Sequence, residues 1–116
     1  MADGTIKRGM VLLWEGNISA QGNSATLSQS MFNFDSLILV CLANSQIYSI
    51  QIPVESSGLG LRKTLSCSTD AINTGFTYNC TINFSFTNET TVTIESKSQN
   101  SVNWGAALRQ IYGIKY

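Results

Sequence analysis

The chain has few residues that could do acid–base or nucleophilic chemistry. It contains seven carboxylates, three cysteines and no histidine. Without histidine, neither a Ser-His-Asp triad nor a Cys-His pair can form within the chain. No spacing in the sequence brings two carboxylates together for general acid–base work, because they fall at expected turns and strand ends: Asp3, Glu15, Asp35, Glu55, Asp70, Glu89 and Glu95. We therefore expect a protein that is not an enzyme.

Metal and cofactor sites are also not indicated. Cys41, Cys67 and Cys80 have no Cys-x-x-Cys spacing, and no group of closely spaced acidic residues is typical of a calcium loop. The segment 58–60 lacks the third glycine of a phosphate-binding loop. We expect no metal and no cofactor. Because Cys41 and Cys80 lie in apolar patterns typical of buried free thiols, we expect folding in a reducing cytoplasm.

With neither catalysis nor a metal or cofactor site indicated, the function to consider is ligand binding. The candidate binding residues have aromatic or amide side chains. Carbohydrate sites commonly stack an aromatic ring on a sugar and hold the hydroxyls with polar groups. Trp104 lies in a polar segment with Asn100 and Asn103, and Tyr48 is a further aromatic residue with a polar group. These four residues are the candidate binding site. The alternative for Trp104 is a structural role, at the end of the sandwich or at a subunit contact.

Composition narrows the class of partner. The chain has 116 residues, which we interpret as one domain over residues 1–116, with 43% hydrophobic and only 12% charged residues and zero net charge. Nucleic-acid binding usually rests on a clustered basic surface, and none is visible in the sequence. The longest apolar run, residues 37–43, is too short to cross a bilayer, and residues 1–4 are not typical of a signal peptide. We expect neither nucleic-acid binding nor membrane insertion.

Residues 76–86 carry the clearest structural pattern. Aromatic and aliphatic residues and cysteine alternate there with Thr, Asn and Ser, which is the period of a strand with one buried face. A helix would spread these apolar residues around its whole circumference. The segment therefore predicts one long strand with a Thr/Asn face directed outward.

Seven other segments predict strands or strand ends, separated by turn residues: residues 10–14, 25–28, 37–42, 48–52, 59–67, 92–94 and 108–114. Residues 37–42 are apolar at every position, which indicates a strand covered on both faces, as in a central strand or one under a partner chain. Pro53 should end its strand, and Gly113 is a candidate bulge. Residues 27–31 and 102–108 are candidate single helical turns. About seven or eight strands at this spacing predict an all-β antiparallel sandwich, jelly-roll-like.

Each end of the chain carries a short series of motifs. Within residues 11–40 these are Leu-Trp, a polar loop, Thr-Leu-Ser and Asn-Phe in that order, and at residues 111–115 the motif is Ile-Tyr-Gly-Ile-Lys. Together they resemble the C-terminal domains of bacteriophage tail-fibre and baseplate proteins. The two ends make up about half of the chain. The segment 53–74 resembles nothing in that family.

The resemblance implies a non-enzymatic β-sandwich at a fibre tip, found in the virion, assembled as a homo-oligomer with a trimer favoured, and contacting other virion proteins. It also implies attachment to host-surface polysaccharide or protein, through loop residues that differ between phages. Two alternatives remain open. One is a structural virion protein, such as a baseplate or head-decoration subunit, with subunit contacts only; the other is a bacterial carbohydrate-binding module.

Overall fold

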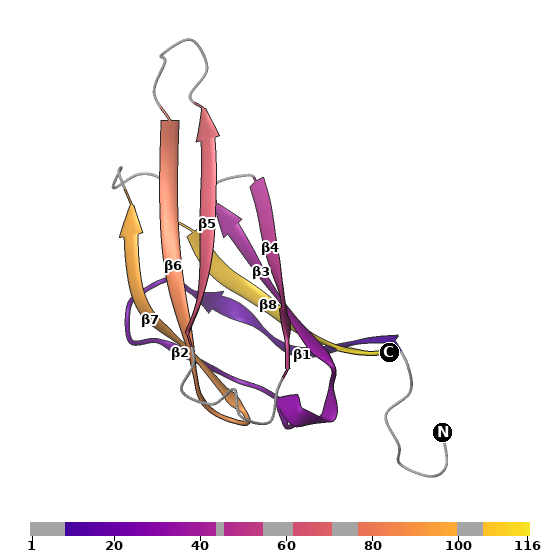
Figure 1. The fold of residues 1–116 in the computed structure, drawn as a ribbon. Coiled ribbons are helices and arrows are strands. Elements are labelled where there is room, and N and C mark those ends of the chain that lie inside the picture. The colour runs from indigo at the N-terminus through magenta and orange to yellow at the C-terminus, as the bar shows by residue number, and fades with distance from the viewer. Residues whose placement is uncertain (1–8, 44–45, 55–61, 71–76, 100–105) are drawn as a thin grey trace.

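The computed structural model describes residues 9–43, 46–54, 62–70, 77–99 and 106–116, and it is an antiparallel β-sandwich (Figure 1). Its elements are β1 (Gly9–Ile18), β2 (Ser24–Thr26), a 3-10 turn η1 (Met31–Asn33), β3 (Ser36–Ala43), β4 (Gln46–Pro53), β5 (Arg62–Asp70), β6 (Thr77–Asn88), β7 (Thr91–Gln99) and β8 (Ala106–Lys115). Sheet A has the order β1-β8-β3-β4, and sheet B has the order β2-β7-β6-β5. The predicted all-β sandwich is confirmed.

Some strand pairs join distant parts of the chain, as in a jelly roll, and others join consecutive strands as hairpins. The first strand pairs with the last, β1 with β8, and β2 pairs with β7. By contrast, β3 and β4 form a hairpin and β5, β6 and β7 form a meander within one sheet. All of these pairings are antiparallel. The chain ends therefore meet in sheet A, while the middle of the chain builds most of sheet B.

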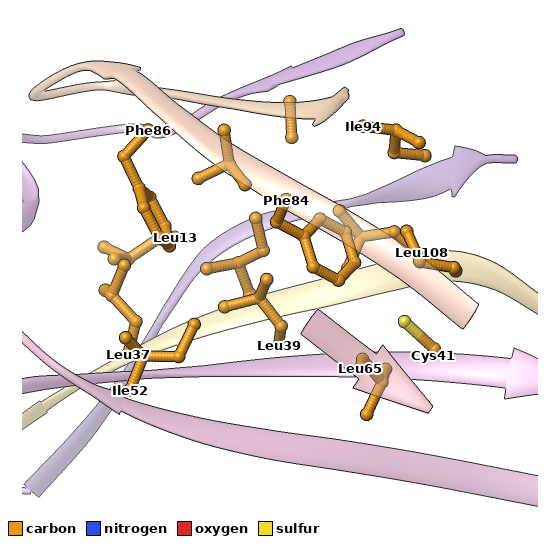
Figure 2. Packing of buried hydrophobic residues seen from close by; sticks show 14 of the residues in the cluster. Leu13, Leu37, Leu39, Cys41, Ile52, Leu65, Phe84, Phe86, Ile94 and Leu108 are labelled. Carbon is orange, nitrogen blue, oxygen red and sulfur yellow. The ribbon is translucent and has the colours of Figure 1, made fainter. Parts of the chain in front are cut away.

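The alternation predicted around residues 76–86 produces β6. Its inward residues Cys80, Ile82, Phe84 and Phe86 are buried, and the residues between them face outward. Figure 2 shows Phe84 among side chains from both sheets, including Leu39, Cys41 and Leu108. The core is thus the dry layer between the two sheets, as the two-residue period of a strand requires.

Gly113 is not a bulge, and that prediction is wrong. It pairs in regular register with Val11 on β1 and with Leu37 on β3. A Cβ atom built on Gly113 would lie 2.6 Å from Cγ of Phe34, so the aromatic ring occupies the space that a side chain would need. The interruption in register between β8 and β3 lies at Arg109 instead, where Val40 pairs with Gln110 and Cys41 with Leu108. The glycine allows close approach of a ring to a strand.

Neither predicted helical turn forms as expected. The 3-10 turn lies at Met31–Asn33, later than the predicted residues 27–31, and the Ser30 hydroxyl caps it by accepting from the Phe32 amide at 3.1 Å. Residues 106–108 belong to β8, because β3 pairs with them. The rest of the second predicted turn, residues 102–105, lies outside the described part of the chain.

The prediction that both faces of residues 37–42 are covered is half right. Leu37, Leu39 and Cys41 are buried, whereas Ile38, Val40 and Leu42 are only partly buried on the opposite face. In this single chain, nothing among the described residues forms a third layer over that side of sheet A. The outer face of β3 therefore remains apolar and accessible.

Candidate functional site

The predicted binding residues do not form a site that the structure describes. Trp104, Asn103 and Asn100 lie outside the described residues. Tyr48 is half-buried, pairs with buried Cys41 and packs against the core. Its hydroxyl donates to Oε1 of Gln46 at 2.6 Å. The ring of Tyr48 therefore contributes to the packing of the sandwich, and its role in binding stays a prediction.

Three of the described carboxylates are engaged in separate local contacts. Glu15 accepts from Nε2 of Gln110 at 2.9 Å, and Glu89 accepts from the Ser30 hydroxyl at 3.3 Å. Asp35 accepts from the Tyr116 amide at 2.8 Å. Among the described residues, no three acidic, cysteine or histidine side chains gather where they could hold a metal ion. The contacts of Asp35 and Glu89 tie chain segments together.

Cys41 and Cys80 are buried free thiols, as predicted. Sγ of Cys80 accepts from the Ala106 amide at 3.5 Å, which connects sheet B to the start of β8. Cys67 on β5 lies opposite Cys80 on β6, and its side chain is not among those that the structure describes. Since both described thiols are in the core, they act as small packing groups.

The largest unexplained feature is the outer side of sheet A, where apolar side chains from all four strands lie together. We call this set the apolar face: Met10, Leu12, Ile38, Val40, Leu42, Ile47, Ala107, Tyr112 and Ile114. None of its residues is charged. The exposed fraction reaches 59% for Met10 and 74% for Ile47. Contiguous apolar surface of this kind marks interaction sites on soluble proteins.

The strand registers arrange the outer side of sheet A in rows. One row runs from Leu12 through Tyr112 and Ile38 to Gln51. The next contains Glu15, Gln110, Val40 and Ser49, and a third joins Ala107, Leu42 and Ile47. Cross-strand neighbours in such rows lie about 5 Å apart, so the apolar side chains touch along and across the strands. Polar groups lie in the middle row, at the β4 edge and at the start of β3, where the Ser36 hydroxyl is 3.4 Å from the Tyr116 hydroxyl.

A depression on the outer side of sheet A lies where the register between neighbouring strands is interrupted. Leu13 is an extra residue of β1 relative to β8, and Arg109 is an extra residue of β8 relative to β3. The bulge at Arg109 lets its Nε donate to the Gly16 carbonyl at 3.0 Å. A shallow depression of about 250 Å³ lies here, lined by Glu15, Val40, Cys41, Leu42, Ile47, Arg109 and Gln110. Bulges of this kind re-aim side chains at functional surfaces.

The outer side of sheet B has the opposite chemistry. Asn83 accepts from the Thr64 hydroxyl and donates from Nδ2 to Oγ of Ser96 at 2.7 Å. Ser24 and Thr93 hydroxyls are 2.8 Å apart on neighbouring strands. Asn83 belongs to the Thr/Asn face predicted from residues 76–86, and it bonds to side chains on both neighbouring strands. Such a surface is stable in water without a partner.

Sequence reasoning predicted that residues 37–42 are covered on both faces, as in a central strand or one under a partner chain, but missed the apolar face as a whole. The local signal was present in the continuous apolar run at residues 37–42. The contributions of Met10, Leu12 and Ile47 depend on strand pairing and could not be seen locally. No family model matches the chain, and no curated protein matches its sequence. Within the described residues, no helix is long and apolar enough to span a membrane.

Proposed function

We propose that this chain is a non-enzymatic β-sandwich domain of the phage tail-fibre or baseplate kind, which assembles with copies of itself through the apolar face. The observation that carries the assembly is the apolar face on the outer side of sheet A. The phage assignment rests on the resemblance of the two chain ends, and it implies a location in the virion after assembly in the bacterial cytoplasm.

The contrast between the two sheets supports this function. The apolar face exposes methionine, leucine and isoleucine side chains to water, which costs free energy in proportion to apolar area. The Thr, Asn and Ser side chains of sheet B are bonded to one another and gain little from being covered. Assembly through sheet A therefore removes the unfavourable surface and leaves sheet B in solvent.

Val40→Glu tests the assembly. Val40 lies on β3 near the middle of the apolar face, in the row that also holds Glu15. Arg109 lines the same depression but already donates to the Gly16 carbonyl, so association would bury the new carboxylate among apolar side chains and near a like charge. An uncompensated buried charge costs about 3 kcal/mol or more, which corresponds to a hundred-fold weaker association. We expect the parent chain to sediment as a homo-oligomer and the variant as a monomer at the same concentration.

Ser85→Glu is the matched control for that experiment. Ser85 lies on the outer side of sheet B and pairs with Thr93. A carboxylate there should leave the oligomer intact, because that side stays in solvent. A monomeric parent chain at tens of micromolar would contradict the assembly, as would a Val40→Glu variant that sediments like the parent.

Attachment to a host-surface glycan or protein is the second part of the proposal, and a Trp beside two Asn residues in the sequence supports it. Trp104→Ala is expected to abolish binding to host cells or their polysaccharide while circular dichroism remains that of the parent. Tyr48→Phe should leave binding unchanged, because Tyr48 packs on the core side of β4. Unchanged binding by Trp104→Ala would exclude this site.

An oligomer without host affinity would favour the structural virion role, and a glycan-binding monomer would favour a bacterial carbohydrate-binding module.

A further inference from the structure

Two of the three cysteines lie directly opposite each other in sheet B. Cys67 on β5 and Cys80 on β6 are Cα partners in a register that runs without interruption from Arg62 to Asp70. We infer that these two residues are the site of a reversible intrachain disulfide, which forms when the reduced protein meets a small-molecule disulfide such as glutathione disulfide. The inference rests on the register of β5 and β6 and does not depend on the proposed function.

The spacing of paired strands allows this bond. Opposed residues of an antiparallel pair share one face of the sheet, with Cα atoms about 4.5–5.5 Å apart. A disulfide requires Cα atoms about 4.4–6.8 Å apart. Cβ atoms of opposed residues are about 4.5–5.5 Å apart, whereas a relaxed disulfide has them about 3.5–4.5 Å apart. The strands must therefore draw together slightly, and the resulting strain makes the bond easy to reduce again.

Cys41 is not a competing partner in the fold. It lies on sheet A, where it pairs with Tyr48 on β4 and with Leu108 on β8. No register among the described strands places a second cysteine opposite it. With three cysteines in the chain, the bond between Cys67 and Cys80 therefore leaves the Cys41 thiol free.

Access to the buried Cys80 thiol requires a local opening, and the position of β5 provides one. β5 is an edge strand of sheet B and pairs with β6 alone among the described strands (Figure 1). Cys67 lies near the end of β5 at Asp70, and strand ends at an edge open at a lower free energy than the whole domain. Sγ of Cys80 accepts from the Ala106 amide at 3.5 Å, and because sulfur is a weak acceptor this contact does not prevent reaction.

The reaction is two successive thiol–disulfide exchanges. The thiolate of one cysteine attacks glutathione disulfide, forms a mixed disulfide and releases one glutathione thiolate. The thiolate of the other cysteine then attacks the protein sulfur of the mixed disulfide and releases the second glutathione. The two cysteines lose two electrons, which reduce glutathione disulfide to two glutathione molecules, and these take up the two thiol protons.

The bond would fix the edge strand to the sheet. It closes the loop over residues 67–80, which restricts the unfolded chain and so stabilises the folded one. It also joins β5 to β6 close to the strand end that opens most easily. A protein of the proposed virion kind would fold with free thiols in the reducing cytoplasm and gain the bond outside the cell.

Thiol counting in the full-length chain tests the inference. The reduced protein, freed of reductant, is incubated with glutathione disulfide and then unfolded and alkylated with iodoacetamide. Mass spectrometry should find one alkylated cysteine, Cys41, instead of three, and peptide mapping should recover Cys67 linked to Cys80. The Tm should rise by about 5 °C or more at a fixed protein concentration. Dithiothreitol should restore the three thiols and the original Tm.

Three variants serve as controls. After the same incubation, Cys67→Ser should keep two alkylated thiols and gain no thermal stability. Cys41→Ala should show no alkylated thiol and the same gain as the parent. Val40→Glu should also form the bond, because both cysteines lie on sheet B, so a failure of assembly and a failure of this inference are distinguishable.

Several results would overturn the disulfide. One is a parent chain that keeps three alkylated thiols after incubation. Others are a link that includes Cys41, a glutathione adduct that persists without closing the ring, and a covalent dimer that dithiothreitol separates. Peptide mapping of the parent chain distinguishes all of these without relying on any variant.

Discussion

Phe84→Ala is expected to lower the free energy of unfolding by about 3–5 kcal/mol, the usual cost of deleting a fully buried aromatic ring. Phe84 is wholly inaccessible to solvent and lies on β6, which pairs with strands on both sides. Its ring fills the space between the sheets near Leu39 and Leu108 (Figure 2). Alanine at position 84 would leave a cavity. The cavity would not close, because β6 is hydrogen-bonded to β5 on one side and to β7 on the other.

That loss is large beside the total stability of a domain, about 5–15 kcal/mol. Denaturant unfolding followed by circular dichroism would measure it, at one fixed protein concentration because association raises apparent stability. Phe84→Leu should lose less, since most of the volume remains. Ser85→Ala, at the next position on the opposite side, should be nearly neutral. A Phe84→Ala variant as stable as the parent would mean that the sheets do not pack around this ring.

Gly113→Ala is also expected to lower the free energy of unfolding substantially, although it adds only one methyl group. The added Cβ would lie 2.6–2.7 Å from atoms of the Phe34 ring, closer than atoms in proteins approach. Both residues are buried, and Gly113 is held between β1 and β3, so neither can move away freely. Overpacking of this kind costs about 1–3 kcal/mol and occasionally more. Thermal or denaturant unfolding would show the loss.

Gly16→Ala is the matched control. Its Cβ would also meet a ring, that of Trp14, at 2.6 Å, but Trp14 is only half-buried. The indole can swing outward, so we expect a smaller loss of stability. Phe34→Leu should partly rescue Gly113→Ala in a double-mutant cycle, because it removes the clashing ring atoms. Additive losses in that cycle would contradict direct contact between the two positions.

The strands themselves were predictable because their signals are local. The alternation at residues 76–86 requires no knowledge of partners, since successive side chains of any strand point to opposite sides. It placed Ile82, Phe84 and Phe86 in the core, and the structure confirms this. Pro53 ends β4 as expected, because proline cannot donate to a ladder.

Features that depend on distant segments were not predictable. Gly113 was interpreted as a bulge because a glycine in a strand often marks one; its partner Phe34 lies far away in sequence, and only folding brings the ring against it. The packing of Tyr48 against the core likewise depends on the pairing of β4 with β3, which places it opposite Cys41.

Sequence alone therefore determined that this protein is an all-β sandwich with a polar Thr/Asn face, because periodicity and turn residues act over a few positions. Tertiary structure decided that β1, β8, β3 and β4 share one sheet, and hence that Met10, Leu12 and Ile47 extend the apolar surface of β3. The physical reason is that strand order and register are set by contacts between residues far apart in the chain, to which no local pattern is sensitive.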